Sequence, residues 1–124
     1  GSYLGVHEGP QRISKIGNTV ALEPGMIVSN EPGYYKSGEF GIRIENLVTV
    51  TRSELPDGGE KPLLKFETLT RAPIDRNLID TSLMNPDELG WLNSYHQTVQ
   101  DDLIGIVDPQ TANWLQDVTS PLTN

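Results

Sequence analysis

Two glutamates and an arginine stand close together in residues 25–50, the most informative stretch of this 124-residue sequence. Glu31 immediately precedes a proline, and Arg43 and Glu45 are two residues apart in an apolar run. Carboxylate oxygens are ligands for hard and borderline divalent cations, and an arginine beside them can orient a carboxylate that binds a metal. These residue types therefore allow a metal site, but a solvated face of an ordinary antiparallel sheet explains the charges as well.

Two β-rich runs carry these charges. Residues 26–29 and 40–50 flank a segment rich in proline and glycine at 32–38, which predicts two antiparallel strands joined by an ordered loop. Side chains alternate between the two faces of a strand. The second run therefore predicts one apolar face, which we expect to be core, made of Phe40, Ile42, Ile44, Val48 and Val50. Arg43 and Glu45 share the opposite face.

Three motifs in this half of the chain resemble those of the Xaa-Pro aminopeptidases (aminopeptidase P). In order and at family-like spacing they are VHEGP (6–10), NEPGYY (30–35) and GIRIEN (41–46). The resemblance continues through FETLT and WLNSYH, so it covers nearly the whole chain. It implies an α+β fold. Residues 1–72 would form the C-terminal part of a pita-bread metallopeptidase catalytic domain with antiparallel β strands, and residues 73–124 a helical C-terminal extension packing on it.

The resemblance implies a metal-dependent hydrolase, a proline-specific aminopeptidase that removes the first residue of a peptide whose second residue is proline. Two divalent metal ions, usually manganese, would activate the attacking water. By resemblance, Glu31 binds one metal and accepts the proton of the water, Glu45 bridges both metals, and His7 contacts the substrate or the tetrahedral intermediate. Arg43 and Tyr35 match residues that hold the ligand carboxylates in place.

The same resemblance indicates a C-terminal fragment of a longer enzyme. Two aspartates and a histidine that complete the metal site of this family lie upstream, and the sequence begins after them. We therefore expect an active parent enzyme, and a fragment that is inactive alone and binds no metal tightly. The alternative is a pita-bread relative that has lost catalysis and works as a peptide- or protein-binding module. The presence of His7, Glu31, Arg43 and Glu45 favours the enzyme.

Composition limits the partners. Nine basic against seventeen acidic residues give a net charge of −8, which repels phosphate backbones and argues against nucleic acid. No apolar run approaches the roughly 20 residues that span a bilayer. The sequence has no cysteine, which excludes disulfides and thiolate metal sites and is compatible with a reducing compartment. We expect a cytoplasmic enzyme that acts on peptides with proline at the second position and, as the parent protein, a homodimer.

The C-terminal half predicts helices. Residues 51–61 read as a loop, 63–69 as another strand of the same sheet, and 74–83 as a short helical segment. Asn85, Pro86 and Glu88 mark the start of a helix by cap, first-turn proline and capping box. Its apolar stripe is Leu92, Tyr95, Val99, Leu103 and Ile106. A second helix follows from Asp108-Pro109, with apolar positions Ala112, Leu115 and Val118.

The aromatic residues of these helices are expected to pack against the protein rather than to stack on a ligand. They are Trp91, Tyr95 and Trp114. His96 is expected to be a structural or interface histidine, because no acid or second histidine follows it at i+4 to share a metal.

Overall fold

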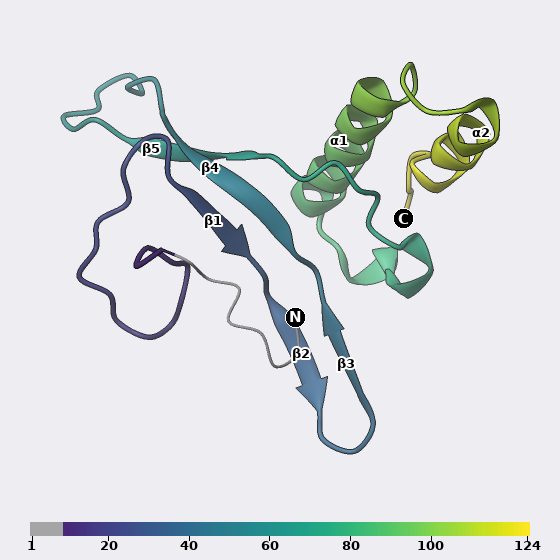
Figure 1. Ribbon diagram of the computed structural model, residues 1–124, viewed down its shortest axis with the longest axis horizontal. Coiled ribbons are helices and arrows are strands. Elements are labelled where there is room, and N and C mark those ends of the chain that lie inside the picture. The colour runs from purple at the N-terminus through teal and green to yellow at the C-terminus, as the bar shows by residue number, and fades with distance from the viewer. Residues whose placement is uncertain (1–8) are drawn as a thin grey trace. The chain divides into compact units, whose positions relative to one another are not determined.

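The computed structural model describes residues 9–124 (Figure 1). His7, a predicted site residue, therefore lies outside the described residues. The chain divides into two compact units, Gly1–Thr70 and Arg71–Asn124, which we call the sheet unit and the helical unit. The domain boundary that the sequence predicts, between residues 72 and 73, stays a prediction about how the longer protein is organised.

Antiparallel strands build the sheet unit. β4 (Asn46–Arg52) pairs with β1 (Ile27–Asn30) on one side and with β5 (Leu64–Thr68) on the other. β2 (Gly33–Lys36) and β3 (Phe40–Arg43) pair separately as a hairpin (Figure 1). The predicted antiparallel pairing of the two β-rich runs is confirmed, and so is the return of the later strand to the same sheet.

The prediction of a loop between the two runs is partly wrong, because that segment contains β2. The second run is likewise two strands, β3 and β4, rather than one. Both interruptions occur at the same place, where Ile44 N donates to Pro32 O at 3.2 Å. Pro32 has no N–H to return this hydrogen bond, so the ladder between the two strands cannot continue unbroken past it.

Only part of the predicted apolar face is core. Val48 and Val50 are buried, and Val28 is buried opposite Val48. The other three predicted core residues, in β3 and just after it, are exposed within the described chain: Phe40, Ile42 and Ile44. The break near Ile44 explains the difference, because it separates these three residues from the sheet and places them in or next to the hairpin, where Phe40 meets the ring of Tyr34 with centroids 6.1 Å apart.

Two short 3₁₀ turns, Arg76–Leu78 and Thr81–Leu83, precede α1 (Pro86–Leu103) and α2 (Pro109–Val118) in the helical unit. The predicted capping box of α1 is confirmed: the Asn85 side chain accepts from Asp87 N and Glu88 N, and Glu88 accepts from Asn85 N. Asp108 caps α2 in the same way. In the described part of the chain, neither helix is long and apolar enough to cross a membrane.

The core of the helical unit is small. Tyr95, Val99 and Leu115 are buried together, with partly buried apolar neighbours Ile74, Leu103 and Ile104. The prediction that Ile106 belongs to the packed stripe is wrong: the residue is 78% exposed, because α1 ends at Leu103 and the chain turns away.

Aromatic packing in the helices differs from one residue to the next. Tyr95 is buried as predicted, and Trp91 stacks on it with ring centroids 5.6 Å apart. Trp91 nevertheless remains 54% exposed and Trp114 53%, so each indole is only partly packed. His96 has the predicted structural role: it is fully buried, and its Nε2 accepts a hydrogen bond from Ile74 N at 3.2 Å.

Candidate functional site

The guanidinium of Arg43 joins the two predicted ligand carboxylates. Its Nη2 lies 3.2 Å from Glu45 Oε2, and its Nη1 lies 3.6 Å from Glu31 Oε2. Both carboxylates therefore lie on the same side of the strands that carry them and within reach of a single cationic group.

Two strand junctions place these acids. Glu31 lies in the connection from β1 to β2, and Glu45 lies in the connection from β3 to β4. The junctions are side by side, since Ile44 N bonds to Pro32 O between them. The register is the same on both sides of the break, with Asn30 opposite Asn46 and Gly33 opposite Arg43, so Glu31 and Glu45 lie at facing positions between these pairs.

Ser29 is a contact that sequence reasoning missed. Its Oγ donates to Glu31 Oε1 at 3.0 Å and so helps to fix that carboxylate. The signal was present in the sequence, because residues two apart along an extended chain point to the same side. Without the strand's bounds, however, the spacing alone did not distinguish Ser29 from other serines.

The electrostatics of this cluster are those of a partly exposed site. The side chains of Glu31, Glu45 and Arg43 are 28%, 40% and 47% exposed. Ion pairs with this exposure contribute at most about 1 kcal/mol each to stability.

The residues present fit part of a site for hard or borderline divalent ions. Carboxylate oxygens are suitable donors, and Arg43 can orient both of them. In residues 9–124, however, no group of three or more His, Cys, Asp and Glu side chains could hold a metal ion. Two carboxylates bind such an ion weakly, because it keeps most of its water shell. The described chain thus brings together two candidate carboxylate ligands.

Tyr35 lies on the same hairpin face as Arg43. Tyr35 pairs with Gly41 across the hairpin and Gly33 pairs with Arg43, so these four positions alternate onto one side of the two strands. The aromatic ring covers both glycines. Its predicted role in holding the ligand carboxylates stays a prediction, as does that of His7.

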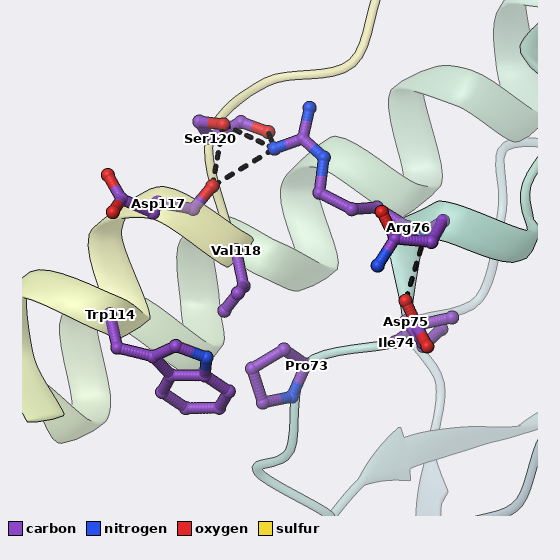
Figure 2. Close-up of a pocket in the computed structure, with 9 residues that line it drawn as sticks. Pro73, Ile74, Asp75, Arg76, Trp114, Asp117, Val118 and Ser120 are labelled. Atoms are coloured by element: carbon purple, nitrogen blue, oxygen red, sulfur yellow. Dashed lines mark hydrogen bonds between the residues drawn. The ribbon is translucent and has the colours of Figure 1, made fainter.

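A cleft in the helical unit is separate from these residues. It encloses about 620 Å³ and is lined by the 3₁₀ turn at Arg76 and by α2, with Trp114 and Pro73 among its walls (Figure 2). The Arg76 guanidinium donates to Asp117 O at 3.0 Å and to Ser120 O at 3.1 Å. Arg76, a charged residue that lines the cleft, is therefore already hydrogen-bonded to the C-terminal end of α2.

Family comparisons match both units. Residues 1–52 match metallopeptidase family M24, and residues 62–122 match the C-terminal region of peptidase M24. The chain is 46% identical over 129 residues to a probable Xaa-Pro aminopeptidase P of Talaromyces stipitatus, covering 98% of this chain and 19% of the relative. It is 48% identical over 125 residues to aminopeptidase P2 of Arabidopsis thaliana, covering 98% and 18%.

A solved structure shares the fold. It is the crystal structure of an X-prolyl aminopeptidase from Caenorhabditis elegans, described as a cytosolic enzyme with a di-nuclear active site. The TM-score is 0.80 at 32% identity, over 97% of this chain and 20% of that one. The predicted α+β fold, the C-terminal part of a pita-bread domain followed by helices, is thereby confirmed.

These relatives are much longer than this sequence. The chain spans about a fifth of the length of the curated relatives and of the solved structure that it matches. Together, the two family matches, the identities over nearly all of the chain and the shared fold show that it belongs to metallopeptidase family M24, as a counterpart of the C-terminal part of its Xaa-Pro aminopeptidases.

Proposed function

We propose that the longer protein carrying this chain is a metal-dependent Xaa-Pro aminopeptidase, which hydrolyses the bond between the first residue of a peptide and a proline in second position. The observation that supports this most directly is the contact of one guanidinium, that of Arg43, with both Glu31 and Glu45. The 46% identity to a probable Xaa-Pro aminopeptidase P over nearly the whole chain supports the same activity.

In this proposal each site residue of the chain has its own role. Two bound divalent ions would make a water acidic enough to attack the peptide near neutral pH. Glu31 would hold one ion and would accept the proton that the water releases, and Glu45 would be a ligand shared by both ions. Arg43 and Tyr35 keep both carboxylates in position, and His7 donates to the substrate or to the tetrahedral intermediate.

Three finer proposals go with this activity. Manganese is the proposed metal, and the di-nuclear site of the C. elegans relative supports a pair of ions. The cytosolic location of that relative supports a cytoplasmic enzyme. A homodimer of the longer protein remains part of the proposal. The 124-residue chain by itself should bind no metal tightly and hydrolyse no Xaa-Pro peptide, since two carboxylates are too few ligands for two ions.

The test is hydrolysis of an Xaa-Pro peptide by the full-length protein with manganese in excess. We expect Glu45→Ala to abolish turnover, because it removes the bridging carboxylate. His7→Ala should be milder, with a loss of about 10²- to 10³-fold, as for removal of one donor to a developing oxyanion. Glu67→Ala is a matched control, since Glu67 is an exposed glutamate on β5.

Two outcomes would contradict the proposal. Activity of the Glu45→Ala enzyme at the wild-type level would refute the assignment of the metal-bridging residue. A full-length protein that binds Xaa-Pro peptides but never cleaves them with any divalent ion would instead support a non-catalytic binding module.

A further inference from the structure

The ring of Tyr35 occupies the space that side chains at two glycines would need. An ideal Cβ at Gly41 would lie 2.6 Å from Tyr35 Cδ1, and one at Gly33 would lie 2.9 Å from both Cε2 and Oη of Tyr35. Both distances are shorter than real Cβ atoms allow. The phenol therefore lies flat across the hairpin, with one edge over Gly41 and its hydroxyl end over Gly33.

The backbone does not require glycine at either position. The glycines of the described chain with positive φ are Gly25, Gly38 and Gly58. Gly33 and Gly41 lie in β2 and β3 in conformations open to any residue. Glycine weakens a strand, because it adds no packing and loses more conformational freedom on folding. Space for the Tyr35 ring is thus the feature of this hairpin that calls for two glycines.

The hairpin register places that ring beside the charged cluster. Gly33 is the cross-strand partner of Arg43, and the hydroxyl end of Tyr35 covers Gly33. Tyr35 and Arg43 project from the same face, and the hydroxyl end of the ring lies over the residue that is paired with Arg43. Arg43 is the residue whose two terminal nitrogens reach Glu31 and Glu45.

We propose that Gly33 and Gly41 are positioning residues, which form a side-chain-free floor that lets Tyr35 lie beside Arg43 and keep its guanidinium turned toward both carboxylates. The consequence for catalysis rests on the proposed function. The packing of Tyr35 on the two glycines does not depend on the proposed function. The floor and the activity can therefore be tested separately.

The first experiment is a double-mutant cycle in the full-length protein. Gly41→Ala should expel the ring and reproduce the effect of Tyr35→Ala: kcat and manganese affinity fall by about 10- to 100-fold, as on loss of a group that orients metal ligands, with little change in KM. The double variant should be no worse than Tyr35→Ala alone, and should melt at a temperature equal to or above it, because alanine suits a strand better than glycine once the ring is gone.

A matched control lies in the turn of the same hairpin. Gly38 has φ +75° and no atom within contact distance of an added Cβ. Gly38→Ala should lower the melting temperature through backbone strain, and this loss should add to that of Tyr35→Ala. Additive effects of Gly41→Ala and Tyr35→Ala on kcat and melting temperature would overturn the proposal.

The second experiment measures the position of the Tyr35 ring without an activity assay. In full-length protein labelled with ¹³C at glycine Cα, the α-protons of Gly33 and Gly41 should be shifted upfield by the ring current of Tyr35 and should return to ordinary values in Tyr35→Leu, while those of Gly38 stay unchanged. Unshifted Gly33 and Gly41 protons in the wild type would refute the floor. Shifted protons in a protein that cleaves no Xaa-Pro peptide would refute the proposed function and leave the floor intact.

Discussion

In the helical unit, side chains form hydrogen bonds to the backbone of segments distant in sequence. In the sheet unit, the charged side chains of the Arg43 cluster and the aromatic side chains of the hairpin lie at the surface. In the helical unit, Tyr95 Oη donates to Ala72 O at 2.7 Å, and Asn93 exchanges two hydrogen bonds with the backbone of Leu122, at 2.9 and 2.8 Å. In the sheet unit, the ion pairs of Arg43 are partly exposed and join side chains only.

Apolar exposure separates the β2–β3 hairpin from the helical core, although the helical unit also exposes Trp91, Trp114 and Ile106. The β2–β3 hairpin leaves Tyr34, Phe40 and Ile42 at least 41% exposed. The buried centre of the helical unit instead gathers apolar side chains from both helices around Val99 and Leu115. The difference indicates that substitutions in the helical core destabilise this chain, while those in the Arg43 cluster of the sheet unit mainly change its chemistry. Four substitutions test this division, in decreasing order of their expected effect on stability.

Leu115→Ala should have the largest effect. The side chain is 1% exposed at the centre of the helical core, and truncation of a buried leucine costs about 2–5 kcal/mol through lost contacts and the cavity left behind. Both tryptophans of the chain lie in α1 and α2, so denaturant unfolding followed by tryptophan fluorescence reports on this unit. Leu83→Ala, at a side chain 82% exposed, is the control and should change the free energy of unfolding by less than about 0.5 kcal/mol.

Arg76→Ala comes next. The guanidinium donates to Asp117 O and Ser120 O, and it also bonds to the Ser120 hydroxyl (Figure 2). These are groups at the C-terminal end of α2, where a cation also interacts well with the helix dipole. Loss of hydrogen bonds from a charged donor costs about 1.5–3 kcal/mol. Arg76→Lys should restore part of this in the same denaturant titration, and an Arg76→Ala chain as stable as wild type would show that the contact is dispensable.

Local signals in the sequence predicted the helical unit well. The capping box at Asn85 and Glu88 and the proline between them are determined by neighbouring residues, so their reading needed no tertiary information. Ile106 was misplaced because hydrophobic periodicity continues in the sequence beyond the end of a helix. The polar contacts that tie residues 72–76 to the helices were not predicted, since they join positions far apart in sequence.

The site was predicted by motif rather than by pattern. Alternation in the strand alone left Arg43 and Glu45 compatible with a solvated face, and nothing local placed Glu31 beside them. The missing information was the strand register, which is the same on both sides of the break at Pro32 and so places Glu31 opposite Glu45. The exposure of Phe40 was not predictable in the same way, since burial depends on what packs against a hairpin and not on the alternation of its side chains.

Acid should destabilise the helical unit through His96. Burial, and secondarily the charge of Arg76, hold the pKa of His96 below its usual value. The neutral ring accepts the Ile74 N–H at Nε2, and protonation would put a hydrogen on Nε2 and remove this acceptor. Because the unfolded chain takes up the proton at about pH 6.5 and the folded chain only at lower pH, the stability present at pH 7 and above is lost as pH falls below about 6.5.

For the uptake of one proton, the free energy of unfolding should fall by at most about 1.4 kcal/mol per pH unit. The measurement is the free energy of unfolding between pH 7.5 and pH 5, compared with that of His96→Gln, which keeps an acceptor for Ile74 N but does not titrate. Since the carboxylates titrate equally in both chains, the difference between the two curves isolates His96. Parallel curves would show that His96 is protonated as readily in the folded chain as in the unfolded one.

Arg43→Ala should have the smallest effect on stability and yet a large one on activity. Its two ion pairs are partly exposed, so their combined loss should change the free energy of unfolding of this chain by about 1 kcal/mol, within the ceiling of about 2 kcal/mol for two such pairs. In the full-length protein the same change leaves two carboxylates without the group that orients them, and we expect turnover of an Xaa-Pro peptide to fall by about 10- to 100-fold.

Arg43→Lys separates charge from geometry at the same position. Lysine keeps the positive charge but has a single ammonium group in place of the planar fork whose two nitrogens reach Glu31 and Glu45 separately. If orientation is the role of Arg43, the lysine variant should be as stable as wild type and nearly as impaired in turnover as Arg43→Ala. Full activity of Arg43→Lys would reduce the role to charge neutralisation. A loss of stability above about 2 kcal/mol in either variant would exceed what exposed pairs contribute, and would place a structural determinant of the sheet unit in the cluster that is assigned to its chemistry.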